Sequence, residues 1–225
     1  MKSTSSLMQR LVELIPAELE HTSGSVFYSG TEAFSSSSPL YVLGLNPGGD
    51  PIAQSEETIR WHTNRVLNEY PRNWSAYRDE SWRGKKPGSY GMAPRILHLF
   101  DKLSLDPGQV PCSNLIFKRT RREQDIKQHK QLLADQCWPF HAHVIENQQP
   151  SLILCFGATV GKYVCGKLDA TELAGEFVER NNRRWKSRAF KNTSSQTVVV
   201  ATHPSIANWT APNTDPSALV AEALE

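Results

Sequence analysis

The sequence predicts an α/β fold, a single three-layer α/β/α domain with a central, mostly parallel sheet of four strands. Apolar runs of strand length recur along the chain, helical patterns separate them, and several runs end at Gly or at one polar residue. Strands that alternate with helices in this way are typical of a parallel sheet with helices on both faces. The chain has 225 residues, 39% of them hydrophobic, which suits one well-buried domain over 1–225. The four predicted strands are 40–45, 110–117, 151–156 and 197–201.

Residues 1–39 are expected to form an N-terminal helix and a loop. Leu7, Leu11 and Leu14 lie on one helical face that ends at Pro16, and the Ser-rich segment 22–39 has room for a short strand at 26–28. The first strand then ends in a Gly- and Pro-rich turn over 44–50. The polar segment 51–90 is long, with a helix predicted over 56–70. Its aromatic residues argue against disorder.

Later elements follow the same alternation. A helix is predicted from Pro94 to about 105, a second from Glu123 or Asp125 with a kink or break at Trp138-Pro139, and a short one over 158–164. The basic segment 166–196 is expected to be a loop or small hairpin. Asp215-Pro216 marks the start of a last helix.

Three polar residues fall at predicted strand ends: Asn46, Asn114 and His203. Ligands of open α/β sheets bind at the carboxyl ends of the strands. We therefore expect these three side chains to converge on one site.

Composition narrows the partners. The net charge is only +2, but basic residues gather near aromatic ones at 83–86, 118–122 and 180–191, a pattern that suits a nucleic-acid backbone and exposed bases. The four cysteines contain no C-x-x-C pair, so we expect core thiols, no metal and no cofactor. No apolar run could span a membrane and Met1–Arg10 lacks a signal-peptide core, so an intracellular protein, in the cytoplasm of a prokaryote or the nucleus of a eukaryote, is expected.

Two motifs resemble the uracil-DNA glycosylase superfamily, in particular its mismatch-specific and single-strand-selective monofunctional members. Gly44-Leu45-Asn46-Pro47-Gly48 resembles the first motif, Gly-x-Asn-Pro-Gly, and His203-Pro204-Ser205 the start of the second. Segments 91–103 and 138–157 are also similar, so the resemblance covers about 40–210. The iron–sulfur members are excluded by the missing cysteine pairs.

The resemblance implies a monofunctional DNA glycosylase that flips a damaged base out of DNA and cleaves its bond to the sugar with water. His203 would donate to the carbonyl that gains charge, and Asn46 would orient the water. Asn114 would recognise the base, which Gly44, Leu45, Pro47 and Gly48 would line. Tyr90 is the expected stacking residue, with Trp82 as the alternative. Asp50 is an alternative carboxylate for the water.

Contacts with DNA are expected from the residues after His203 and from one basic cluster. Ala207 stands where the family has a bulky wedge and is too small to fill the stack, so Ile206 or Trp209 would take that role. The insertion 51–90 is also longer than the family pattern suggests. A non-catalytic nucleic-acid-binding module and a glycosidase of another nucleic acid or of nucleosides stay open as alternatives. We expect a monomer with no membrane partner, whose DNA-binding residues are Ser205, Ile206, Trp209, Lys118, Arg119, Arg121 and Arg122.

Overall fold

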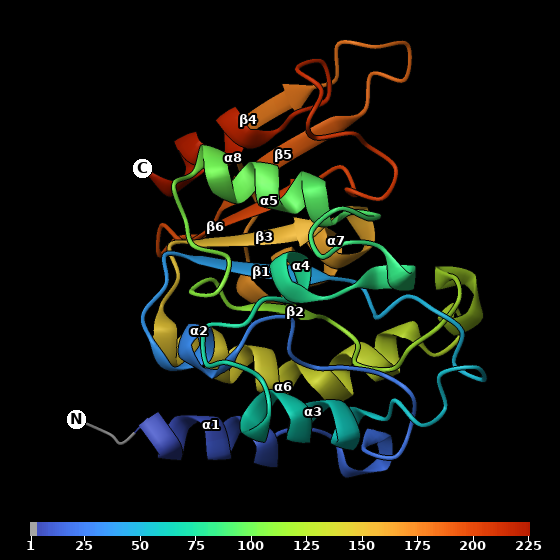
Figure 1. Ribbon diagram of the computed structural model, residues 1–225. Coiled ribbons are helices and arrows are strands. Elements are labelled where there is room, and N and C mark those ends of the chain that lie inside the picture. The colour runs from blue at the N-terminus through green and yellow to red at the C-terminus, as the bar shows by residue number, and fades with distance from the viewer. Residues whose placement is uncertain (1–3) are drawn as a thin grey trace.

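The computed structural model describes residues 4–225, which form one mixed sheet of six strands with helices on both faces (Figure 1). The strand order is β2-β1-β3-β6-β5-β4. The first four strands in this order are parallel, and β5 pairs antiparallel with both β6 and β4. The strands are β1 (Leu40–Gly44), β2 (Cys112–Asn114), β3 (Leu152–Phe156), β4 (Glu172–Val178), β5 (Lys186–Lys191) and β6 (Thr197–Ala201).

The α/β class and the four parallel strands are confirmed, but the expected four-stranded sheet was too small. The basic segment 166–196 forms the antiparallel hairpin β4–β5, which adds two strands beside β6. Alternating burial explains why this segment forms a strand: Ser187 and Ala189 of β5 are buried, while Lys186 and Arg188, each one residue before them, are exposed. The β4–β5 register shifts between Leu173 and Gly175.

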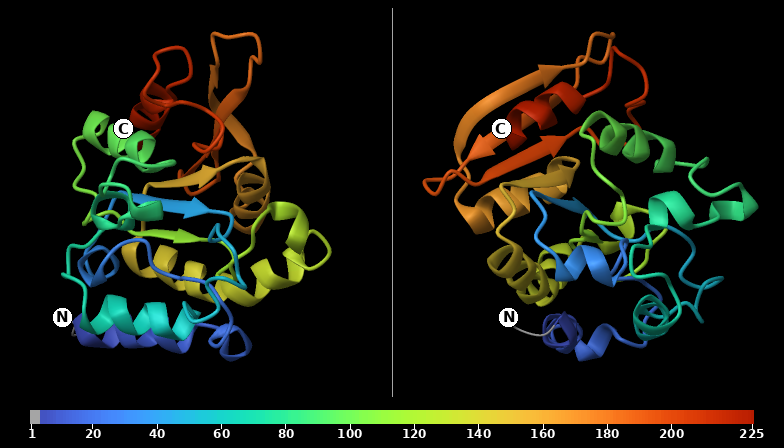
Figure 2. Two further views of the ribbon diagram at one scale, coloured as in Figure 1. Left: turned by 45° about the vertical axis from the view of Figure 1, so that its right-hand side comes forward. Right: turned by 60° about the vertical axis from the view of Figure 1, so that its left-hand side comes forward.

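The helices pack against two apolar clusters, one on each face of the sheet. One face is covered mainly by α1, α2, α3, α6 and α7, and the other by α4, α5 and α8; α5 crosses in front of the sheet in Figure 1. Both views of Figure 2 place α1 and α3 at the end of the molecule farthest from the β4–β5 hairpin. The helices are α1 (Thr4–Glu13), α2 (Thr31–Ser35), α3 (Ile59–Asn68), α4 (Ala76–Asp79), α5 (Ala93–Lys102), α6 (Lys130–Gln148), α7 (Ala158–Leu168) and α8 (Ser217–Leu224), with short 3₁₀ turns η1 (Ala17–Leu19), η2 (Trp82–Gly84) and η3 (Glu123–Ile126).

The sequence predicted a kink or break at Trp138-Pro139, and the break was wrong. Helix α6 runs continuously from Lys130 to Gln148 with Pro139 inside it. Cys137, Phe140 and Val144 on both sides of the proline are buried against the sheet. Their packing outweighs the one backbone hydrogen bond that proline cannot donate.

The cysteines are core residues, as expected. Cys112, Cys137 and Cys155 are buried, Cys165 is half-buried, and all four are free thiols. Among the described residues, no helix combines the length and apolar character needed to cross a bilayer.

Candidate functional site

A row of four residues crosses the carboxyl ends of the parallel strands. Asn114 ends β2, Gly44 ends β1, Phe156 ends β3, and His203 follows β6 by two residues. Gly44 pairs with Asn114, and Phe156 with Ala201, the last residue of β6. Adjacent strands lie ~4.8 Å apart, so the row spans ~14 Å. The polar strand ends that the sequence predicted therefore face one edge of the sheet.

Gly44 is required by the position of the Asn114 amide. A Cβ atom at residue 44 would lie 2.2 Å from Asn114 Oδ1 and 3.9 Å from Phe156 Cδ2. The Asn114 amide thus lies directly against the Gly44 backbone within the row. Asn114 is 7% exposed, so only a small part of its surface is open to a ligand.

Buried groups hold the Asn114 backbone from behind. The Tyr41 hydroxyl bonds His141 Nδ1 at 2.7 Å, and His141 Nε2 bonds the Leu115 carbonyl at 3.3 Å. A carbonyl only accepts, so Nε2 carries the proton and Nδ1 accepts from Tyr41. Burial lowers the pKa of His141 to about 3, which keeps the ring neutral.

Tyr28 lies beside β2, where its backbone N–H donates to the Cys112 carbonyl at 2.9 Å. Burial raises the pKa of its hydroxyl, and the nearby Ser25 and Asn114 side chains partly oppose that rise. The Tyr28 ring also lies 5.9 Å from the Tyr77 ring, centroid to centroid. Tyr28 is thus an aromatic neighbour of the candidate base-recognition amide.

The amide of Asn46 is fixed by its nitrogen. Nδ2 donates to Thr120 Oγ1 at 2.8 Å, to the Pro47 carbonyl at 3.1 Å and to the Lys118 carbonyl at 3.3 Å. A flipped amide would put its oxygen against two carbonyl oxygens, so the chemistry decides the orientation. Oδ1 makes no hydrogen bond within residues 4–225 and is left as an acceptor.

The rest of the first turn is tied to the chain that follows β2. The Leu45 carbonyl accepts from Ile116 N at 2.9 Å, and the Pro47 carbonyl accepts from Thr120 N at 3.1 Å. Leu45 is half-buried and Pro47 is buried. A Cβ at Gly48 would meet nothing within 4 Å, so this exposed position leaves open space beside the site.

His203 is a neutral donor in this arrangement. Its Nδ1 accepts from the Ser205 backbone N–H at 3.0 Å and lies 2.8 Å from Ser205 Oγ. Because a backbone N–H can only donate, Nδ1 is unprotonated and the proton is on Nε2. Burial lowers the pKa of His203, and the charge of Glu123 opposes this in part. Gly157, at the end of β3, has a φ of 89° that favours glycine, and it lies beside His203, since a Cβ there would make an ordinary contact with His203 Cβ at 3.6 Å.

Two arginines hold the turn that carries His203. Arg95 of α5 donates to the Pro204 carbonyl, and Arg183 of the β4–β5 connection donates to the Ile206 carbonyl at 2.9 Å. The Ile206 and Ala207 amides donate back to the His203 carbonyl at 3.0 and 3.1 Å. The turn is therefore fixed from both sides.

Glu123 is a site neighbour that the sequence did not indicate. Its carboxylate accepts from Thr159 Oγ1 at 2.8 Å and from Lys130 Nζ at 2.5 Å. The Lys130 and Thr159 bonds and the charge of His203 contribute to a lowered pKa for Glu123. It ties η3 to the first turn of α7, next to the His203 ring. A lone Glu after a basic run carries no local signal of that contact.

The basic cluster after β2 divides into exposed and structural residues. Lys118 and Arg122 are exposed, and Arg121 pairs with Asp50 on the surface. The expected DNA-binding role of Arg119 needs correction: its side chain is 11% exposed. The guanidinium donates to Ser23 Oγ, the Gly48 carbonyl and Glu57 Oε2 at 2.9–3.0 Å. These partners are far away in the sequence, so the cluster alone could not reveal them.

The Asp50 carboxylate is engaged by Arg121 and by the Ile52 N–H, and these bonds lower its pKa. The Asp50 carboxylate is therefore occupied by bonds within its own surface region.

The two alternatives for the wedge residue, Ile206 and Trp209, differ in their exposure. Trp209 is completely buried, donates from Nε1 to the Thr202 carbonyl at 3.0 Å and packs edge-on against Phe156. The expectation that Trp209 contacts DNA was wrong, because its ring supports β3 from inside. Ile206 is 56% exposed, and Ser205 beside it is exposed.

The predicted stacking residue Tyr90 is 36% exposed, and Arg83 lies 5.9 Å from its ring. Trp82 is half-buried, packs edge-on against Tyr77 and donates to Glu80 Oε2 at 2.8 Å. Phe156, which belongs to the row, lies edge-on to the His203 ring with the centroids 6.2 Å apart. The sequence indicated strands at 151–156 and 26–28 but no site role for Phe156 or Tyr28.

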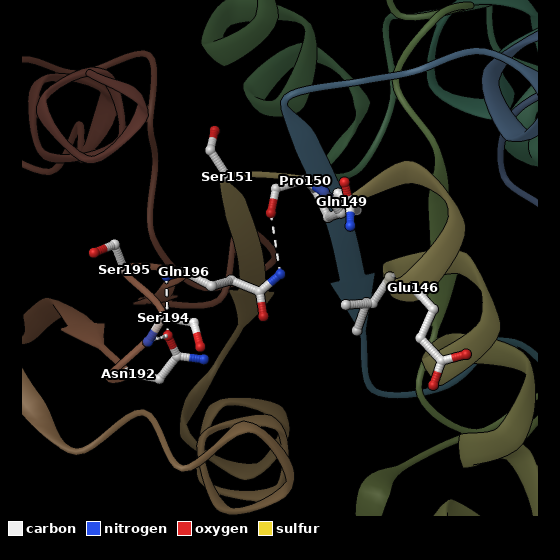
Figure 3. A pocket seen from close by; sticks show the side chains of 9 residues that line it. Glu146, Gln149, Pro150, Ser151, Asn192, Ser194, Ser195 and Gln196 are labelled. Carbon is white, nitrogen blue, oxygen red and sulfur yellow. Dashed lines mark hydrogen bonds between the residues drawn. The ribbon is translucent and has the colours of Figure 1, made fainter.

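A polar hollow of about 440 Å³ lies at the opposite end of the sheet. Figure 3 shows it between the segments that enter β3 and β6, where Gln196 Nε2 donates to the Pro150 carbonyl at 3.1 Å. None of the predicted site residues lines it.

Within residues 4–225, no three His, Cys, Asp or Glu side chains are grouped to bind a metal ion. No protein-family model matches this sequence, and a search of curated proteins returned no match either.

Proposed function

We propose that the protein is a monofunctional DNA glycosylase of the uracil-DNA glycosylase type, which hydrolyses the N-glycosidic bond of uracil or a related deaminated or modified base. One observation carries the proposal. At one sheet edge, His203 Nε2–H is left as a donor and Asn46 Oδ1 as an acceptor, each because its other polar atom is bound within the protein. The motif resemblance supports the same assignment.

The donor acts on the leaving group. As the bond between the base and the sugar carbon breaks, negative charge develops on the base and reaches its carbonyl oxygen. A hydrogen bond from His203 Nε2 to that oxygen strengthens as the charge grows, so it stabilises the transition state more than the bound substrate. The neutral ring suffices because hydrogen bonding needs no full positive charge.

The acceptor acts on the water. Asn46 Oδ1 would accept one hydrogen of a water whose oxygen attacks the sugar carbon. An amide cannot take the proton, so the water is positioned rather than deprotonated. The new carbon–oxygen bond replaces the carbon–nitrogen bond, and the proton ends on the departing base. Such a mechanism depends mainly on leaving-group stabilisation.

Base selection would fall to Asn114. One acceptor and one donor on its amide match the imide N–H and neighbouring carbonyl of uracil, whereas cytosine offers the reverse pattern. The close contact with Gly44 restricts the amide, which is the condition for such discrimination.

A second candidate function is a non-catalytic module that binds a flipped base. The observation that favours it is the pairing of Asp50 with Arg121, which leaves an amide as the water-facing group of the first turn. Turnover separates the two functions.

The test is base release from single- and double-stranded oligonucleotides carrying uracil, hypoxanthine, xanthine or hydroxymethyluracil, scored as alkali-labile abasic sites. We expect His203→Ala to lower the rate by ~10²–10³-fold, and Asn46→Ala by ~10²-fold or more with binding nearly unchanged. His21→Ala and Asn68→Ala, at exposed positions, are the matched controls. Release that survives both site variants would refute the site, and salt-sensitive binding without any release would favour the binding module.

A further inference from the structure

The β4–β5 connection, residues 179–185, lies at the same edge of the sheet as the candidate site. Strand β5 starts at this edge, because Arg188 pairs with Val200 near the end of β6 and Ser187 Oγ accepts from Thr202 N at 3.0 Å. In Figure 1 the connection lies at the end to which the β3 arrowhead points. We call residues 179–185 the hairpin tip.

The hairpin tip carries cations and an aromatic ring open to solvent. Trp185 is 37% exposed, and the Arg183 guanidinium lies 4.0 Å from the ring centroid. Arg180 and Arg184 are exposed and form no ion pair with any of the described residues. Outside the tip, Lys186 and Arg188 both pair with Glu176.

The tip is also built rigidly and joined to the second motif. Asn181 Oδ1 accepts from the Arg183 and Arg184 amides at 2.9 and 3.2 Å, and Glu179 N donates to the Trp185 carbonyl at 2.8 Å. Arg183 bonds Glu179 and the Ile206 carbonyl with the same guanidinium. The exposed Ile206 and the exposed Trp185 are therefore connected through a single side chain.

From this arrangement we infer that the hairpin tip binds the DNA strand beside the target nucleotide, with an unpaired base on Trp185 and backbone phosphates at Arg180 and Arg184. An exposed aromatic ring near two arginines without ion pairs, Arg180 and Arg184, suits single-stranded nucleic acid, because stacking accepts any base and the cations meet phosphates. Arg183, which is ion-paired with Glu179, holds the ring in place. The basic residues Lys118 and Arg122 contact the strand from the β2 side of the row. The inference rests on the proposed function, since it places the tip beside its site.

A second surface tryptophan beside an arginine provides an internal control. Trp61 of α3 is 41% exposed with Arg65 at 4.8 Å from its ring, so it repeats the Arg–Trp pair. Helix α3, which carries Trp61, lies at the end of the molecule away from the hairpin (Figures 1 and 2). A surface tryptophan beside an arginine is thus available at a position that the inference excludes.

The experiment measures the affinity of a labelled single-stranded oligonucleotide containing uracil, and of the same strand without it, by fluorescence anisotropy at several salt concentrations. We expect Trp185→Ala to raise Kd about 5-fold to 100-fold for both strands, and Trp185→Phe to retain most of the affinity. Arg184→Gln should reduce the slope of log Kd against log salt by about 0.7. Trp61→Ala should bind like the parent, and circular dichroism melts show whether each variant is folded.

Parental binding by a folded Trp185→Ala variant would overturn the inference, as would an equal loss in Trp61→Ala, and so would absence of any DNA binding by the parent. Base release is scored separately on the same proteins. Base release by the parent together with unchanged DNA binding by Trp185→Ala would refute the role of the hairpin tip and support the glycosylase function. Weakened DNA binding by Trp185→Ala without any base release by the parent would support the DNA-binding surface and refute the glycosylase function.

Discussion

The contact between Gly44 and Asn114 permits a quantitative test of the site. In Gly44→Ala, the added methyl would lie 2.2 Å from Asn114 Oδ1 and 3.4 Å from its Cγ, so the amide must move by about 1 Å or rotate away. Overpacking of this kind costs about 1–3 kcal/mol. After Asn114→Ala, the nearest neighbour that remains is Phe156 Cδ2 at 3.9 Å, an ordinary contact. Ala at residue 44 should then be neutral or stabilise by up to about 1 kcal/mol, because it restricts the unfolded chain.

The double-mutant cycle should therefore show a coupling free energy of about 2 kcal/mol between the two positions. Urea unfolding of the parent, both single variants and the double variant measures it, with a shift of about 2–4 °C per kcal/mol in thermal melts as a second readout. Base release should fall in both single variants, and the double variant should be no slower than Asn114→Ala. Additive free energies of unfolding would refute the close contact and the restricted amide that follows from it.

Three further predictions concern the residues around this contact. Thr120→Val removes an acceptor of Asn46 Nδ2 without changing shape, so base release should fall about 10-fold to 100-fold in single-turnover assays, and an unchanged rate would contradict the fixed amide. Arg119→Ala should cost about 2–4 kcal/mol of stability in urea unfolding and leave the salt slope of DNA binding unchanged, whereas Arg122→Ala should lower that slope by about 0.7–0.9 with little effect on stability. Burial lowers the pKa of His62 to about 4 from 6.5, so the unfolded chain takes up its proton first as the pH falls below 6.5. His62 should therefore contribute about 2 kcal/mol to the loss of stability between pH 8 and pH 5, in addition to the loss from the buried His141. The total loss should be smaller by that amount in His62→Gln, and an equal loss would contradict the buried neutral ring.

Local sequence patterns predicted β1, β3 and β6 well, since each is a short, mostly apolar run that is almost completely buried, whereas β2 covers only three residues of the predicted 110–117. The same runs indicated the positions of Asn46, Asn114 and His203, because a polar residue at the end of a buried strand lies at the edge of the sheet. The hairpin β4–β5 was harder to predict, since its outer strand is mostly exposed and reads as a polar loop.

The errors share a physical cause, which is contact between residues distant in the sequence. Arg119 belongs to a basic run by composition, but Ser23 and Glu57 bury its guanidinium. Trp209 follows an exposed turn, but the Thr202 carbonyl and Phe156 hold its ring inside. Pro139 breaks helices by its local preference, but α6 continues through it because residues on both sides of the proline are buried. Such partners become visible only when the chain is folded.

The two edge strands of the sheet affect how readily the protein aggregates at high concentration. A border strand offers unpaired amides and carbonyls to other molecules unless it is short, covered or irregular. Here β2 has three residues, and antiparallel bridges from Phe27 to Ser113 and from Gly24 to Lys118 cover its free side. On the opposite border, the shifted register in β4 bends the strand, and Gly175 packs closely against Leu219 of α8. Both borders are therefore poor templates for ribbon-like aggregation, and crowded molecules should stay separate.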